Sequence, residues 1–84
     1  NRRPKSPRSE AAGPTAASRA ARDALAANLR ARRKALGLTV TALAERSGVS
    51  RQAIHAILAT GDARLDTVAR LAHALNTTAA DLLR

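Results

Sequence analysis

The stretch VTALAERSGVSRQAIHAIL (residues 40–58) decides the fold, because it predicts two short helices joined by a tight turn. Gly48 stands where the chain must turn with positive φ, a conformation that favours glycine over any residue with a Cβ. Ala44 is small enough to let the two helices approach, and Ile54 and Ile57 give the second helix an apolar side. The other side of that helix is polar. The stretch therefore predicts a helix pair shaped to read nucleic acid.

Apolar residues at helical spacing predict further helices on both sides of this stretch. The helix before it begins at about Ser18 or Asp23 and is stopped by Gly37. Thr39 and Ser50 are suitable N-caps for the two central helices. The five expected helices lie at about 18–36, 40–47, 51–59, 65–75 and 78–83. No stretch alternates like a strand, so the sequence predicts a compact, all-α, five-helix fold.

The composition limits what such a domain can be. The chain has 84 residues, a formal net charge of +9 and no Phe, Tyr, Trp, Met or Cys, so its core must be aliphatic. The excess of positive charge indicates an anionic partner, and no apolar run approaches the roughly 18 residues of a membrane span. Nucleic acid and an anionic membrane are the two candidate partners, and we expect a cytoplasmic protein that binds no membrane. Two distant histidines without cysteines form no recognisable metal site, and no cofactor is predicted.

The N-terminal segment NRRPKSPRSEAAGP (residues 1–14) mixes Pro, Ser, Gly and Arg without periodic apolar residues. Nothing in it offsets the entropy of ordering the chain, so it is predicted to be a disordered basic tail. We place the tail at residues 1–17 and the folded domain at residues 18–84. The tail is interpreted either as an arm that lies along DNA or as a solvated segment without a binding role.

Three segments carry a resemblance to a known family: LRARRKALGLT (29–39), LAERSGVSRQAI (43–54) and LDTVARLAHALN (65–76). They resemble the Cro/C1-type, or XRE-type, helix-turn-helix regulators over nearly all of residues 25–83. The resemblance implies a five-helix, lambda-repressor-like domain that binds operator DNA, usually as a homodimer on a palindrome. It also implies that the helix at about 51–59 enters the major groove. The expected function is that of a sequence-specific transcriptional regulator, and a repressor is the preferred hypothesis.

The resemblance implies that base edges are contacted by Arg51, Gln52 and either His55 or Ala56. The residues themselves agree, because the two isoleucines turn inward and leave Arg51, Gln52 and His55 on the opposite face. Arg can pair with guanine and Gln with adenine in the major groove, and each good bidentate contact contributes about 1–3 kcal/mol of discrimination. These three side chains are the predicted base-contacting set.

Phosphate contacts are expected from hydroxyls and cations around the same helices. Two positions depart from the family pattern: Val40 replaces a frequent Gln that clamps a phosphate, and Leu58 replaces an acidic partner of Arg33. The first departure leaves the clamp to threonines, and the second leaves Arg33 free to face DNA or solvent. The predicted phosphate-contacting residues are Thr39, Thr41, Ser50, Arg33 and Arg64.

The remaining expectations concern partners and chemistry. Leu82 and Leu83 either close the core or form a dimer surface. No nucleophile, base and orienting residue are suitably spaced, so the chain is not expected to be an enzyme. Two alternatives to a sequence-specific regulator stay open. One is a non-specific nucleoid or architectural protein, and the other is a DNA-binding antitoxin with a toxin protein as partner.

Overall fold

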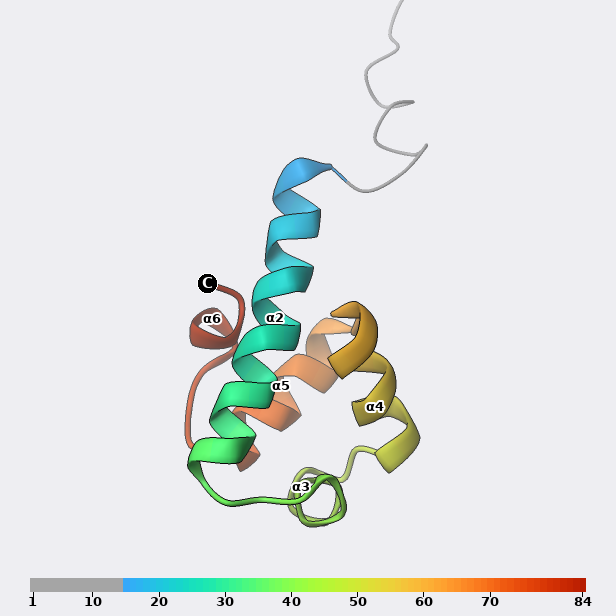
Figure 1. Cartoon of the computed structure of the whole chain (residues 1–84), viewed down its shortest axis with the longest axis vertical. Helices are drawn as coiled ribbons and strands as arrows, with labels where there is room; N and C mark the ends of the chain where they lie inside the picture. The colour runs from blue at the N-terminus through green and yellow to red at the C-terminus, as the bar shows by residue number, and fades with distance from the viewer. Residues whose placement is uncertain (1–14) are drawn as a thin grey trace, which may run out of the picture.

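The computed structural model describes residues 15–84, and the helices of this part pack around a single core. Figure 1 shows the long helix α2 with α4 on one side of it, α6 on the other and α5 behind, while α3 lies near the C-terminal end of α2. Residues 15–84 contain five α-helices and no strand, which confirms the predicted all-α fold. The helices are α2 (Ala16–Ala35), α3 (Val40–Ser47), α4 (Arg51–Thr60), α5 (Leu65–Ala74) and α6 (Ala79–Leu82).

Hydroxyl side chains set the N-terminal ends of four helices. Thr39, Ser50 and Thr78 each accept a hydrogen bond from the backbone N–H three residues on, at 3.0–3.1 Å, which satisfies a donor that the helix leaves unpaired. The caps at Thr39 and Ser50 confirm the predicted starts of α3 and α4.

The start of α2 differs from the prediction. Thr15 accepts from the N–H of Ser18 at 3.1 Å, so the helix begins at Ala16 rather than at Ser18 or Asp23. Residues 16 and 17, which the sequence assigned to the tail, are therefore helical. Thr15 of the predicted tail is the N-cap of this helix, and residues 1–14 of that tail lie outside the described residues.

The core is entirely aliphatic, as the composition requires. It joins Leu25 and Leu29 of α2 to residues from every other helix, and all the buried side chains in this part of the chain are apolar. Its members are Leu25, Leu29, Leu43, Val49, Ile54, Ile57, Val68, Leu71, Ala72, Ala74, Leu75 and Leu82. Leu82 is only 1% exposed, so its side chain closes the core and is not available as a dimer contact. Leu83 is half-buried against the same core.

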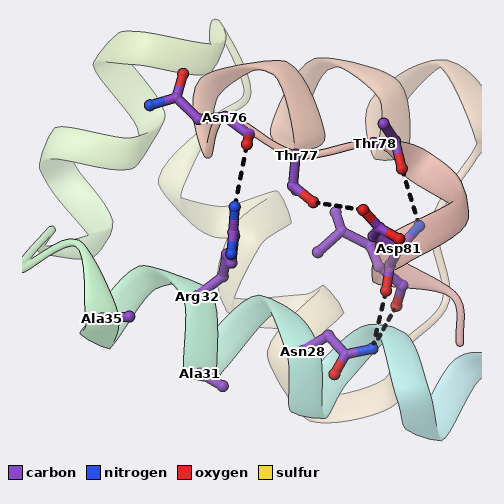
Figure 2. Close-up of a pocket in the computed structure, with 9 residues that line it drawn as sticks. Asn28, Ala31, Arg32, Ala35, Asn76, Thr77, Thr78 and Asp81 are labelled. Atoms are coloured by element: carbon purple, nitrogen blue, oxygen red, sulfur yellow. Dashed lines mark hydrogen bonds between the residues drawn. The ribbon is translucent and has the colours of Figure 1, made fainter.

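The short helix α6 is attached to α2 by one amide side chain. The Nδ2 atom of Asn28 donates to the carbonyl oxygens of Asp81 and Leu82, at 3.3 and 3.0 Å (Figure 2). It also donates to the carbonyl oxygen of Arg84, at 3.2 Å. These carbonyls belong to the last turn of α6 and the residues after it, where a helix lacks its own donors. Nearby, Nη2 of Arg32 donates to the carbonyl of Asn76 at 3.0 Å. Both α6 and the link before it are thereby held on α2.

Candidate nucleic-acid interface

Helix α4 has two sides with different roles. Ile54 is fully buried and Ile57 is 3% exposed, so one side of α4 is anchored in the core. Arg51, Gln52 and His55 are exposed on the other side. Within residues 15–84, none of these three side chains makes a hydrogen bond or an ion pair with the rest of the chain. The three predicted base-contacting residues thus share one face and keep their polar groups available for an external partner.

The N-terminal ends of α3 and α4 contribute to one continuous surface. Ser50, Arg51, Gln52 and His55 line a shallow hollow on α4. Ser50 and Arg51 also line a second hollow, which extends over the turn at residues 48 and 49 to Thr41 in α3. Thr41 itself is exposed. The structure therefore brings Thr41 together with Ser50 and Arg51, as expected for a surface that meets both phosphates and bases.

The capping hydroxyls keep a donor for a ligand. Thr39 and Ser50 accept from the backbone with their oxygens, which leaves each hydroxyl hydrogen free to point outward. The first N–H groups of α3 and α4 lie at the positive ends of the helix dipoles. Hydroxyls and amides in this arrangement suit the oxygens of a phosphate.

A helix-turn-helix family model matches residues 29–82, which is well over half of the chain. The chain belongs to the Cro/C1-type, or XRE-type, helix-turn-helix family. No curated protein and no solved structure shows significant similarity to it. The matched range contains α3 and α4, which form the helix-turn-helix motif with Gly48 in the left-handed conformation at the turn (φ 76).

The family is one of DNA-binding regulatory domains and not of enzymes, so the assignment indicates DNA binding by this helix-turn-helix domain. Within residues 15–84, no group of three or more His, Asp or Glu side chains is placed to hold a metal ion. Over the same residues, no helix is both long and apolar enough to cross a membrane.

The position of Arg33 differs from the expectation that it faces DNA or solvent. Its side chain is half-buried, and Nη1 donates to the carbonyl of Leu38 at 2.9 Å, across the link between α2 and α3. Its Nε atom is buried and has no hydrogen-bond partner. The guanidinium therefore fixes the chain just before the helix-turn-helix motif begins. The acidic partner that the family pattern would place opposite it is absent.

The two positions that leave the family pattern are filled by apolar packing. Val40 and Leu58 are both half-buried against the core. The carbonyl of Leu58 accepts from Nη2 of Arg30 at 3.3 Å, which links α4 to α2.

Arg64 is exposed at the N-cap of α5, where no side chain caps the helix. The first amides of α5 are thus left without a side-chain acceptor. No hydrogen bond or ion pair engages the Arg64 guanidinium within residues 15–84. This arrangement is compatible with its predicted phosphate contact.

Two charged residues near this surface were not predicted from the sequence. Glu45 lines the hollow between Thr41 and Arg51, so one carboxylate stands among the groups that suit phosphate. The side chain of Arg70 lies beside the turn, since its Nη1 atom would be 3.8 Å from a Cβ added at Gly48. Its Nε atom forms an ion pair with the Asp66 carboxylate at 3.1 Å. Their sequence signal was weak, because an isolated charge on a helix is usually a solvated surface residue.

A groove of about 630 Å³ lies away from the motif. Figure 2 shows it between α2 and the link from α5 to α6, and none of its lining residues belongs to α3 or α4. The side chains of Asn28 and Arg32 in this groove are hydrogen-bonded to backbone carbonyls. Its polar groups therefore serve the attachment of α6.

Proposed function

We propose that this helix-turn-helix domain is a sequence-specific transcriptional regulator, acting as a repressor, and that α4 enters the major groove of its operator. One observation carries the proposal: Arg51, Gln52 and His55 are exposed on one face of α4 without partners in the described chain, while Ile54 and Ile57 anchor the other face. Three polar side chains on a rigidly held helix are suited to contact base edges.

In the proposed complex each of these side chains has a distinct chemical role. Arg51 donates two hydrogen bonds to O6 and N7 of guanine, and Gln52 pairs with N6 and N7 of adenine. His55, one turn after Arg51, is able to donate or accept according to its tautomer. These contacts give the domain its sequence preference.

The phosphate contacts fix the register of the domain on the duplex. Thr39, Thr41 and Ser50 donate from the N-terminal ends of α3 and α4, together with the free amides there. Arg64 makes a charged contact from the start of α5. Phosphate contacts carry no base information but hold α4 at a fixed depth and angle.

The domain acts as a homodimer in this proposal. One short helix contacts too few base pairs to single out an operator, and two copies related by a two-fold axis double the site. The half-sites of the resulting palindrome lie about 34 Å apart. Leu83, which is half-buried, remains the candidate dimer contact at the C-terminal end, now without Leu82.

The test is selection of binding sites by the 84-residue chain from a random duplex pool. The expected result is one preferred half-site, repeated as a palindrome with a spacing of about one helical turn, and two chains per duplex. Scrambled duplex at physiological salt is the matched competitor. If it displaces the selected site as well as the site itself does, the domain binds DNA without sequence preference and acts as an architectural protein. Co-purification of a small protein from the native host would add the antitoxin role.

A further inference from the structure

Three of the five acidic residues in residues 15–84 are paired with arginines. The carboxylates of Asp62, Asp66 and Asp81 lie 3.9, 3.1 and 3.1 Å from a guanidinium nitrogen. Asp23 and Glu45 are both exposed, and neither makes a hydrogen bond or an ion pair within the same part of the chain. These two carboxylates therefore keep their negative charge available to an external partner.

The charge of Glu45 does not stabilise the fold. Glu45 lies in the last turn of α3, close to the negative end of the helix dipole, where a carboxylate is unfavourable. It caps neither helix of the motif, since Gly48 is the C-cap of α3 and Ser50 is the N-cap of α4. Neither a local bond nor the helix itself therefore accounts for an acidic residue at this position.

The place of Glu45 on α3 brings its carboxylate to the surface that suits phosphate. Glu45 follows Thr41 by four residues, about one helical turn, so the two side chains lie on the same face of α3. The hollow that they line also includes Ser50 and Arg51 at the start of α4. The hydroxyls, amides and guanidinium of this hollow attract a phosphate, whereas the carboxylate of Glu45 repels it.

We propose that Glu45 limits the affinity of the domain for DNA by repelling the phosphates that approach this hollow. Non-specific binding depends essentially on the neutralisation of phosphates by cations, and the chain carries a formal net charge of +9. One unpaired carboxylate among the phosphate-contacting groups lowers that attraction on every sequence. The inference rests on the phosphate contacts of the proposed function and not on its base contacts. Glu45 thereby keeps a strongly basic domain from being retained on non-specific DNA.

Glu45→Gln tests the repulsion, because it removes the charge and keeps the size of the side chain. We expect this variant to bind a scrambled duplex about fivefold more tightly, the value of one carboxylate facing one phosphate in water at a distance of about 4 Å. The slope of log K against log salt should become steeper by at most about 1. Glu45→Asp keeps the charge and is expected to bind much as the wild-type chain does. Fluorescence anisotropy over a series of salt concentrations measures both quantities.

Asp23→Asn is the matched control, because it removes one negative charge at a site remote from the hollow. Asp23 follows Arg22, whose carbonyl lies against Gly61 at the C-terminal end of α4. Ser50 stands at the other end of this ten-residue helix, about 15 Å away. Such a separation exceeds the screening length of about 10 Å at 0.1 M salt. We therefore expect Asp23→Asn to change the affinity less than about twofold at that salt concentration. Circular dichroism at the temperature of the binding measurement checks that each variant is folded.

The inference is overturned if Glu45→Gln leaves the affinity for scrambled duplex unchanged, or if Asp23→Asn strengthens binding equally. It is also overturned if Glu45→Gln weakens binding, since the carboxylate would then make a favourable contact in the complex. A random pool that yields no preferred sequence has a different meaning. It overturns the sequence preference of the proposed function and leaves this inference standing, because the affinities for scrambled duplex do not depend on that preference.

Discussion

Gly61 lies directly against the backbone of Arg22, which brings the C-terminal end of α4 onto α2. A Cβ at position 61 would overlap the carbonyl oxygen of Arg22 and lie 2.5 Å from its carbonyl carbon. Gly61 is buried and has a φ of 71°. Both the left-handed backbone and the close approach require a residue without a side chain.

Gly61→Ala is therefore expected to lower the free energy of unfolding by about 2–5 kcal/mol, through left-handed strain together with overpacking. Urea denaturation followed by circular dichroism measures the change. Gly37→Ala is the matched control, since Gly37 has a φ of 68° but a Cβ there would meet nothing within 4 Å. Its expected cost is only the strain, about 1–2 kcal/mol. Equal losses in the two variants would contradict the close contact.

Asn28→Ala is expected to loosen α6. The variant loses the donor to three carbonyls at the end of α6, at a cost of about 1–2 kcal/mol of stability. Hydrogen exchange at the amides of Leu82 and Leu83 should accelerate, while DNA affinity stays the same. Gln52→Ala is the reciprocal control and should weaken DNA binding without changing exchange in α6. Unchanged exchange in Asn28→Ala would show that core packing alone holds this helix.

Arg51→Ala is expected to cost about 1–3 kcal/mol of affinity on the selected operator and to relax the preference at one base position. Arg51 is exposed on α4 and has no partner in the described chain, so its guanidinium is available to pair with a base. A comparison of affinities for operators changed singly at each position measures the effect. An equal loss on all sequences would make Arg51 a phosphate contact instead.

Arg33→Met is expected to leave the salt dependence of DNA binding unchanged, because the guanidinium is half-buried and bonded to the Leu38 carbonyl. Arg64→Met, the same change at an exposed cation, should reduce the slope of log K against log salt by about 1. Affinities measured over a series of salt concentrations give both slopes. A reduced slope for Arg33→Met would return this residue to the phosphate-contacting set.

Removal of residues 1–14 is expected to weaken binding to all duplexes alike. The segment carries four basic residues and one acidic residue, and its loss should lower the salt slope by at most about 4. Helix content should be kept, since α2 begins at Ala16. An unchanged slope would favour a solvated tail over an arm that lies along DNA.

Local signals in the sequence predicted most of the fold. Caps such as Thr39 and Ser50 act within three residues, and the left-handed turn at Gly48 follows from the residue type at that position. The polar face of α4 followed from the spacing of its two isoleucines. Such features depend on neighbours along the chain, so the sequence alone contains them.

Contacts between distant segments could not be predicted in this way. Asn28 meets the end of α6 across more than fifty residues, and nothing in its local sequence distinguishes it from a solvated amide. Arg33 was expected to face DNA or solvent because its usual acidic partner is missing. Its Nη1 atom instead donates a hydrogen bond to the Leu38 carbonyl. Leu82 was compatible with either a core or a dimer contact until the packing of α6 was known.

The division of α4 into a buried and an exposed side also bears on how such a domain diversifies. Ile54 and Ile57 hold the helix in place, whereas the exposed positions 51, 52, 55, 56 and 59 take no part in the core. Substitutions at these five positions can therefore accumulate with little loss of stability. One unchanged backbone is thus able to acquire new targets by altering a handful of outward-facing side chains, whether by evolution or in the laboratory.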